Sequence, residues 1–311
     1  MSQKLISVCV PVYNEKDALN TAYERITAVM RECSGYDYEI VFFDDGSTDG
    51  SDKIIETLCE GDPHVKAVIY RRNVGYAKNV FYCAQQAKGD AAVIMHCDLQ
   101  NPPEEIPNLI VKWEEGADIV LGVKNKSKEN KLVYFLRTVC YWILNTFFGM
   151  RMVPHATEFE LFDKSFTDVL KDVRTQNPYL RGLVKEYGRN IEKVYYVQDK
   201  RRTGKSHFNL SKYYDFAMGA IVSRSKCLPR RLIFLSVLCG IACCAEFIFH
   251  FLPHAAETDS AVFWNGVFIR LALLALLALT VIVSLLFEYV IRNAENAERK
   301  PFVTEYKRIG Y

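Results

Sequence analysis

Polar residues that could bind a ligand follow four apolar runs in the first hundred residues of the chain. These clusters lie at residues 11–15, 44–50, 71–73 and 96–100. If the apolar runs are parallel strands, their carboxyl ends lie along one edge of a sheet, which is where α/β proteins bind ligands. A carboxylate pair such as Asp44 and Asp45 can hydrogen-bond a base or a ribose there, and Gly46 permits a tight turn beside it. Asp-Gly-Ser-Thr is also a common turn and helix cap, but four clusters in this order favour one shared ligand site.

The segments that carry these clusters alternate strand and helix patterns, as expected of a parallel sheet with crossover helices. Runs rich in β-branched residues predict strands over residues 6–10, 38–43, 65–70, 91–95 and 119–123. Helical periodicity predicts helices over residues 18–30, 52–58, 77–87 and 105–113. Neither G-x-G-x-x-G nor G-x-x-x-x-G-K-S/T occurs, which argues against a dinucleotide dehydrogenase and a P-loop ATPase.

The composition is that of a folded protein without a global basic surplus. Of the 311 residues 50% are hydrophobic, and 39 Lys and Arg against 37 Asp and Glu leave a net charge of +2. This balance excludes a disordered chain and gives no support to a nucleic-acid partner. The ten cysteines form no C-x-x-C pair and lie mostly in apolar runs, so we expect reduced thiols. We expect no signal peptide, because the short apolar run at residues 5–12 is followed at once by polar residues.

Two apolar stretches near the C-terminus are long enough to cross a bilayer as helices. Residues 232–252 contain one charged residue and residues 267–291 contain two. Lys and Arg flank the pair on its outer sides, whereas the connecting segment at residues 253–264 has neither. The positive-inside rule then predicts that both ends are cytoplasmic. We expect an integral membrane protein with two spans in a cell inner membrane or an ER-type membrane; a buried helical hairpin of a soluble protein is the alternative.

Three segments together resemble the family 2 glycosyltransferases of GT-A fold. They are residues 7–15, 44–49 and 98–104. Within that family the chain is most similar to the polyisoprenyl-phosphate glycosyltransferases, which include dolichyl-phosphate mannose synthase and the bacterial undecaprenyl-phosphate sugar transferases. The resemblance implies an α/β, Rossmann-like GT-A domain with a mostly parallel sheet and amphipathic interfacial helices, followed by two transmembrane helices.

The implied domain boundaries follow the amphipathic and apolar segments. Residues 131–148 and 210–223 are amphipathic and suit helices in the headgroup region, with a core helix as the alternative for the first. A cytoplasmic catalytic domain would then cover residues 1–226, a transmembrane hairpin residues 227–291 and a basic cytoplasmic tail residues 292–311.

The activity that the resemblance implies is an inverting sugar transfer in the biosynthesis of cell envelope glycans. The donor would be a nucleotide-diphosphate sugar, and the acceptor a polyprenyl phosphate, undecaprenyl or dolichyl, on the cytoplasmic leaflet. A phosphate monoester is already largely dianionic at neutral pH, so alignment and charge stabilisation on the leaving side can supply most of the acceleration. The expected partners are the donor, the lipid acceptor and the membrane. The oligomeric state stays open, a homo-oligomer included.

The resemblance also implies a donor site. It places Pro11, Tyr13 and Glu15 around the donor nucleotide and Asp45 on its base or ribose. Asp98 and Gln100 would approach a divalent metal ion, Mn²⁺ or Mg²⁺, that bridges the donor diphosphate. A hard cation with oxygen ligands stabilises the charge that builds up on a departing nucleoside diphosphate.

Residues further along the chain would serve the acceptor. Glu158 stands where the family has a catalytic-site carboxylate and would act as a base or position the acceptor. Lys124 and the basic loop residues Arg201, Arg202 and Lys205 would bind phosphates, as in a similar Arg-x-x-Gly-x-Ser segment of the family. A basic cluster beside a membrane span also serves topology or anionic lipid.

Three residues depart from the family pattern. His96 stands at the first position of a string that is usually Asp-x-Asp-x-Gln, Glu160 where an Arg commonly follows Phe, and Lys124 where an Arg is common. An unusual donor sugar, a changed metal site that includes His96, or a degenerate enzyme would each explain them. The last would be a non-catalytic subunit that binds a nucleotide sugar or a lipid phosphate. A membrane-tethered nucleotidyltransferase is disfavoured, because no Gly-rich, Lys-containing loop follows the first strand.

Overall fold

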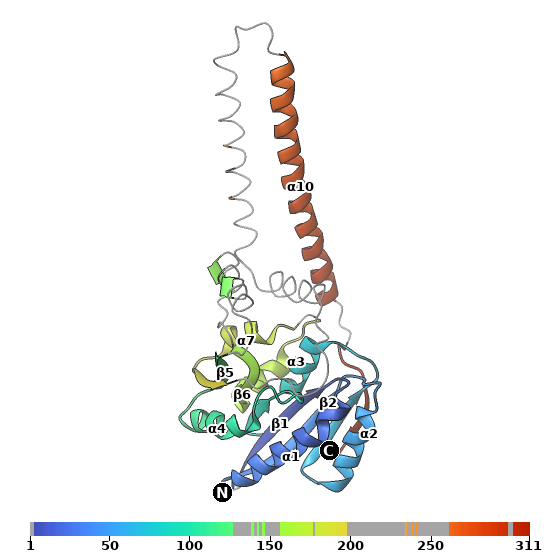
Figure 1. Cartoon of the computed structure of the whole chain (residues 1–311), viewed down its shortest axis with the longest axis vertical. Helices are drawn as coiled ribbons and strands as arrows, with labels where there is room; N and C mark the ends of the chain where they lie inside the picture. The colour runs from blue at the N-terminus through green and yellow to red at the C-terminus, as the bar shows by residue number, and fades with distance from the viewer. Residues whose placement is uncertain are drawn as a thin grey trace.

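An α/β domain and a long helix that extends from it make up the structure (Figure 1), which is a computed structural model. It describes residues 3–126, 138–139, 142, 145–146, 156–176, 178–197, 234, 238, 241, 261–297 and 301–311.

A mostly parallel sheet of eight strands forms the centre of the described domain, in the order β7-β5-β6-β4-β1-β2-β3-β8. The strands are β1 Lys4–Val12, β2 Tyr36–Asp44, β3 Val65–Tyr70, β4 Ala91–Ile94, β5 Ile119–Lys126, β6 Ala156–Asp163, β7 Ile191–Val197 and β8 Glu305–Ile309. Strand β6 runs antiparallel to β4 and β5, and β8 runs antiparallel to β3. Because β6 is reversed, its first residues lie at the same edge of the sheet as the carboxyl ends of β1 and β4.

Helices cover both faces of the sheet. They are α1 Lys16–Glu32, α2 Ser51–Gly61, α3 Tyr76–Gln86, α4 Ile106–Glu114, α6 Lys164–Asp172 and α7 Leu180–Tyr187, and a 3₁₀ turn at Pro103–Glu105 precedes α4. Side chains of α1, α2 and α4 join one apolar core with Ile6, Val8 and Val10 of β1. Side chains of α3, α6 and α7 join a second core with Cys9 on the opposite face of the same strand. Burial on both faces explains why the central strands are almost continuously apolar in sequence.

All five predicted strands and all four predicted helices are present, with ends that differ by a few residues. Strands β6, β7 and β8 and helices α6 and α7 were not predicted. Strand β8 lies within the segment expected only as a basic tail, and it pairs with the edge strand β3. The five described cysteines outside the apolar stretches, Cys9, Cys33, Cys59, Cys83 and Cys97, are free thiols, as expected.

Helix α10, Ala261–Ala297, contains the expected second apolar stretch. Within the described part of the chain it is the one helix long and apolar enough to cross a membrane, over Leu274–Ile291 with a mean hydropathy of 2.5 and no burial against the rest of the molecule. The expected first stretch and the two amphipathic segments lie outside the described residues, apart from a few isolated positions.

Candidate functional site

The loops that follow β1 and β2 are joined by hydrogen bonds at the carboxyl edge of the sheet. The backbone N–H of Asn14 donates to Ser47 Oγ at 2.9 Å, and the N–H of Thr48 donates to Asn14 Oδ1 at 2.8 Å. Asn14 adopts the left-handed conformation with φ 54°, which Asn tolerates better than most residues. The two loops therefore form one surface, with Tyr13 exposed on it at 37% and Pro11 buried beneath.

The first turn of α1 is capped from the second loop. The N–H of Lys16 donates to Asp49 Oδ2 at 3.1 Å, and the N–H of Glu15 donates to Ser51 Oγ at 3.1 Å. Burial raises the pKa of Asp49, but the bonds from Ser51 and Lys16 outweigh it and hold this pKa below its usual range. A charged carboxylate at a helix N-terminus stabilises the helix. Asp49 and Ser51 therefore hold the backbone at Lys16 and Glu15, at the edge of the site.

Asp45 holds the loop that follows β3. Its Oδ1 accepts the N–H of Val74 at 2.7 Å and its Oδ2 accepts the N–H of Gly75 at 3.1 Å. Its 1% exposure raises the pKa of the carboxyl to about 6, although the two N–H bonds oppose the shift. Gly46 has φ +66°, and a Cβ there would lie 2.8 Å from the carbonyl carbon of Arg72. The close approach of the two loops therefore requires glycine at this position.

The loop after β4 presents Asp98 and Gln100 at the same edge. The N–H of Gln100 donates to Asp98 Oδ1 at 3.1 Å. Between them Leu99 is 4% exposed and has φ 56°, a conformation that is costly for a leucine. Asn101, the next residue, accepts a hydrogen bond of 2.5 Å from the Tyr196 hydroxyl of β7. Burial of Leu99 and this bond hold the loop in a strained conformation.

Glu158 lies at the centre of a cluster from four elements. Its Oε2 accepts a hydrogen bond from the hydroxyl of Tyr76, the first residue of α3. The Tyr76 oxygen lies 2.9 Å from Nε2 of His96, and an Arg181 guanidinium nitrogen of α7 lies 3.4 Å from Glu158 Oε1. The Glu158 side chain is 14% exposed, and its burial raises the pKa against the opposing charge of Arg181.

Glu160, two residues further along β6, is buried more deeply. It is 1% exposed, and its Oε2 has no hydrogen-bond partner among the described residues. Burial raises the pKa of this carboxyl to about 8, although the charge of Arg181 opposes the shift. Glu160 is therefore mainly protonated at neutral pH. The carboxylate that pairs with the positive charge of Arg181 is that of Glu158.

The fit of a metal ion depends on Asp98. In the described ranges no three His, Cys, Asp or Glu side chains lie close enough together to hold a metal ion. Nε2 of His96 is engaged by Tyr76. Magnesium-type ions are often bound by one or two carboxylates together with substrate phosphates. Asp98 and Gln100 thus fit a metal ion that shares its ligands with a bound diphosphate, and they do not fit one held by protein groups alone.

The structure gathers most of the predicted site residues at one edge. Pro11, Tyr13, Glu15, Asp45, His96, Asp98, Gln100 and Glu158 lie at the carboxyl ends of β1, β2 and β4 or at the start of β6. Lys124 lies near the carboxyl end of β5, where the neighbouring Val123 pairs with Ala156 of β6. Arg201, Arg202 and Lys205 lie outside the described residues.

Tyr76, Arg181, Tyr196 and Asn101 were missed by sequence reasoning. Each contacts a site residue or the loop that carries one, but its partner is distant in the chain: 82 residues separate Tyr76 from Glu158. The signal that was present is the position of Tyr76, directly after Gly75 in the third polar loop.

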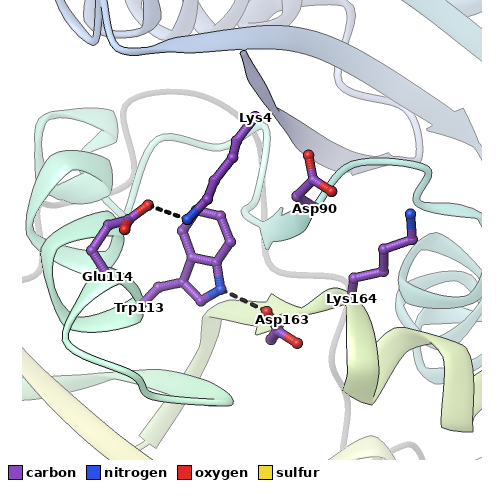
Figure 2. A pocket seen from close by; sticks show the side chains of 6 residues that line it. All are labelled: Lys4, Asp90, Trp113, Glu114, Asp163 and Lys164. Carbon is purple, nitrogen blue, oxygen red and sulfur yellow. Dashed lines mark hydrogen bonds and ion pairs between the residues drawn. The ribbon is translucent and has the colours of Figure 1, made fainter. Parts of the chain in front are cut away.

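A cavity of about 470 Å³ lies at the opposite edge of the sheet (Figure 2). It is lined by Lys4, Asp90, Trp113, Glu114, Asp163 and Lys164. Lys4 pairs with Glu114 at 2.9 Å, and the indole N–H of Trp113 donates to Asp163 at 2.8 Å. The cavity lies at the amino ends of β1 and β4, opposite the carboxyl edge where the predicted site residues gather, so it is not the candidate site.

Comparison with known proteins points to one family. Residues 7–172 match the family described as Glycosyl transferase family 2. An uncharacterized glycosyltransferase of Bacillus subtilis, YkcC, is 30% identical over 98% of this chain and 94% of its own length. A bactoprenol glucosyl transferase of Shigella phage SfV is 33% identical over 71% of this chain and 72% of its own. An undecaprenyl-phosphate 4-deoxy-4-formamido-L-arabinose transferase of Proteus mirabilis is 28% identical over 98% of this chain and 94% of its own length.

Proposed function

Since the chain belongs to glycosyl transferase family 2 and is a glycosyltransferase of α/β GT-A fold, we propose that it transfers a sugar from a nucleotide-diphosphate sugar to a polyprenyl phosphate. One observation carries this proposal. The joined loops after β1 and β2, which could bind a nucleotide, lie at the same edge of the sheet as Asp98 and Glu158. The choice of acceptor is supported by two relatives that are named for bactoprenol and undecaprenyl phosphate.

The donor nucleotide would lie on the joined loops after β1 and β2. Tyr13 offers an exposed ring, and Pro11 and Glu15 flank it on a surface fixed by hydrogen bonds to the second loop. Asp45 completes this part of the site by holding the loop after β3 beside the base or ribose. A surface that is rigid before the donor arrives costs little ordering entropy on binding.

Asp98 and Gln100 would hold Mn²⁺ or Mg²⁺ together with the donor diphosphate. The ion would neutralise the charge that develops on the departing nucleoside diphosphate. Asp98 is partly exposed in this loop, and its Oδ1 accepts the N–H of Gln100 across the strained Leu99, so its carboxylate remains accessible to a bound diphosphate.

The acceptor phosphate would approach the anomeric carbon from the side opposite the diphosphate. One of its oxygens forms the new bond to that carbon while the bond to the diphosphate oxygen breaks, which inverts the configuration. Glu158 would position the acceptor, and Lys124 with Arg201, Arg202 and Lys205 would bind phosphate oxygens. Alignment of a dianionic phosphate with the sugar can supply a large part of the rate acceleration.

The membrane would hold the lipid acceptor close to this edge of the sheet. We propose two spans, with both ends cytoplasmic, of which α10 supplies the second. Strands β1 and β2 point their carboxyl ends toward the side of the domain from which α10 rises (Figure 1). The boundaries 1–226, 227–291 and 292–311 stay proposals, with residues 305–309 of the last segment returning to the sheet as β8.

A second candidate is a non-catalytic subunit that binds a nucleotide sugar or a lipid phosphate. It is favoured by His96, which stands where the family has a carboxylate and which is engaged by Tyr76.

The experiment that separates the two candidates uses membranes from cells that express the chain. These membranes are incubated with radiolabelled UDP-, GDP- and dTDP-sugars, and membranes with Asp98→Asn serve as the control. Label that moves into an organic-extractable, acid-labile lipid in the wild type and not in Asp98→Asn supports the transferase. Label that binds to the membranes without entering lipid, for every donor, supports the binding subunit.

A further inference from the structure

Tyr76, His96 and Glu158 come from three elements and meet in one hydrogen-bonded chain. Tyr76 begins α3, His96 follows β4 and Glu158 lies near the start of β6. The Tyr76 hydroxyl donates to Glu158 Oε2, and its oxygen is 2.9 Å from His96 Nε2. The rings of Tyr76 and His96 also lie 5.4 Å apart between centroids. Tyr76 therefore bridges the strand end that carries Asp98 and the strand that carries Glu158.

The number of hydrogens fixes the direction of this chain. A phenol has one hydrogen to donate, and here Glu158 accepts it. The contact with His96 therefore needs a hydrogen on Nε2, which donates to the Tyr76 oxygen. A ring nitrogen that carries a hydrogen has no lone pair for a metal ion. In this arrangement Nε2 of His96 belongs to the hydrogen-bonded chain and cannot bind a metal ion. Nδ1 keeps a lone pair, but among the described residues His96 belongs to no group of three His, Cys, Asp or Glu side chains that could hold an ion.

The other oxygen of Glu158 is held from a different helix. Arg181 of α7 approaches Oε1 at 3.4 Å while Tyr76 of α3 holds Oε2. The Glu158 side chain is only 14% exposed, so the two contacts restrict it to one orientation. A carboxylate that is fixed on both oxygens is suited to orienting a bound group.

The position of Tyr76 itself is fixed by the donor side of the site. Gly75, the preceding residue, donates its N–H to Asp45 Oδ2 at 3.1 Å. The same loop is held at Val74 by Asp45 Oδ1 at 2.7 Å. The buried Asp45 carboxylate thus fixes the backbone at the start of α3. Tyr76, the first residue of α3, in turn holds Glu158.

We propose that Tyr76 is the positioning residue of Glu158, and that His96 supports this carboxylate through Tyr76 and is not a ligand of the metal ion. The proposal rests on the proposed sugar transfer, in which Glu158 positions the acceptor. It assigns to Tyr76 and His96 an effect on the acceptor step, and to Asp98 the effect on metal binding.

The first test compares two tyrosines of α3. Tyr76→Phe removes the hydroxyl beside Glu158, and the matched control Tyr82→Phe removes a hydroxyl that donates to Glu305 at 2.5 Å, away from the site. We expect Tyr76→Phe to lower kcat by about tenfold to a hundredfold, the effect of losing one hydrogen bond to a charged group, with the donor KM unchanged. Tyr82→Phe should keep the wild-type kcat. Equal kcat in both variants and an active wild type would overturn the proposal.

The second test separates His96 from the metal. His96→Gln keeps an N–H that can reach Tyr76, whereas His96→Ala does not. We expect kcat to be retained in His96→Gln and lowered in His96→Ala, by no more than in Tyr76→Phe. Free Mn²⁺ is measured by electron paramagnetic resonance during titration of each variant with UDP or, in parallel, GDP present. Mn²⁺ affinity should match the wild type in both and fall in Asp98→Asn. A loss of affinity of about tenfold in His96→Ala would contradict the assignment.

A third measurement does not depend on turnover. Tyr76→Phe removes the donor of this hydrogen bond and Glu158→Leu removes its acceptor, so their effects on the thermal unfolding midpoint should not add in the double variant. Additive shifts would refute the Tyr76–Glu158 bond. If the wild type forms no lipid-linked sugar with any donor, the proposed function fails, and this cycle still decides whether Tyr76 holds Glu158.

Discussion

Two carboxyl groups on one strand show how burial divides their roles. Glu158 and Glu160 alternate with Phe159 on β6, so both side chains point to the same side of the strand. Glu158 keeps 14% of its side chain exposed and accepts a hydrogen bond from Tyr76, whereas Glu160 is 1% exposed and its Oε2 finds no partner in the part of the chain that the structure describes. Glu158 is thus accessible to a ligand. Glu160 lowers the free energy of unfolding, because burying an unpaired carboxyl group is unfavourable.

Replacing Glu160 should stabilise the protein in a pH-dependent way. The pKa of this carboxyl is about 8 in the folded chain and near 4.5 when unfolded, so unfolding releases a proton between these values. Wild-type stability therefore falls as pH rises from 4.5 to 8, by about 3 kcal/mol at pH 7. Glu160→Gln should unfold at a higher temperature than the wild type, with a difference that grows from pH 5 to pH 8.

The exposed Glu60 of α2 provides the control. Glu60→Gln should show no such growth of the difference with pH. Thermal unfolding curves of the three proteins at pH 5, 6.5 and 8 decide the matter, and a Glu160→Gln curve parallel to that of the wild type would show that Glu160 is ionised in the fold.

Asp98 is the carboxylate whose loss should cost most turnover. Asp98→Asn removes the charge that would hold the metal ion at the diphosphate, while the amide keeps the size of the side chain and an oxygen that can accept the Gln100 N–H. We expect kcat to fall by at least about a hundredfold, the scale of one electrostatic stabiliser of a transition state. The unfolding midpoint should stay near that of the wild type. If Asp98→Asn kept the full turnover of the wild type, the assignment of Asp98 as a metal ligand would be wrong.

At the scale of elements, the parts that could be predicted are those in which apolar side chains decide the structure. Strand β3 was expected with its observed bounds, because five of its six residues are buried, which makes its sequence apolar except at Lys66. Strands β6 and β8 carry charged residues whose neutralisation depends on distant partners. Arg181 lies beside Glu158 of β6, and Lys307 of β8 pairs with Glu56 of α2. Such partners cannot be read from local periodicity.

The same distinction applies to the site. The polar clusters after each strand predicted where the edge of the sheet would gather its ligand-binding groups. Asp45 was expected to face the nucleotide, but the structure shows both of its oxygens already engaged by Val74 and Gly75. The spacing of residues along the chain carries no information about these contacts, because they arise only when the loops after β2 and β3 pack together.

The segment that follows α10 should contribute to stability through α3. Phe302 packs at 5.9 Å from the ring of Phe81 and 5.8 Å from that of Tyr82, and the neighbouring Val303 is 8% exposed. Because Phe302 is partly buried, we expect Phe302→Ala to lower the free energy of unfolding by about 2 kcal/mol. Denaturant unfolding measures this loss.

Tyr306 in β8 is the control for that measurement. Its side chain is 66% exposed and contacts the Arg71 guanidinium at 5.7 Å. Tyr306→Ala should cost about 0.5 kcal/mol, as expected of an exposed cation–π contact. A loss in Phe302→Ala no larger than in Tyr306→Ala would show that the segment does not pack on α3.

At the scale of the whole molecule, the segment that follows α10 is hydrogen-bonded to the edge of the sheet. Residues 301–311 follow α10 and return along the edge of the sheet, where β8 pairs with β3 (Figure 1). The N–H of Arg71, in the loop after β3, donates to the carbonyl of Thr304 at 2.9 Å. The helix that we propose to lie in the membrane is thus tied to a loop at the edge of the site.

The proposed topology can be tested by cysteine labelling. The absence of Lys and Arg from residues 253–264, against the basic residues on the outer sides of both apolar stretches, predicts that this segment lies across the membrane from the domain. A cysteine introduced at Thr258 should react with an impermeant reagent from the side opposite to one introduced at Glu60. Labelling of both from the same side would contradict two spans.

The measurement that tests the central claim most directly is the chemical identity of the product. Purified protein in lipid nanodiscs that contain undecaprenyl phosphate is given the donor that labels lipid in membranes, and the lipid product is analysed by mass spectrometry. Sugar transfer predicts a lipid with one phosphorus atom per sugar, formed by the wild type and not by Asp98→Asn. A product with two phosphorus atoms, which would mean transfer of a sugar phosphate, or no lipid-linked product with any donor, would contradict the account.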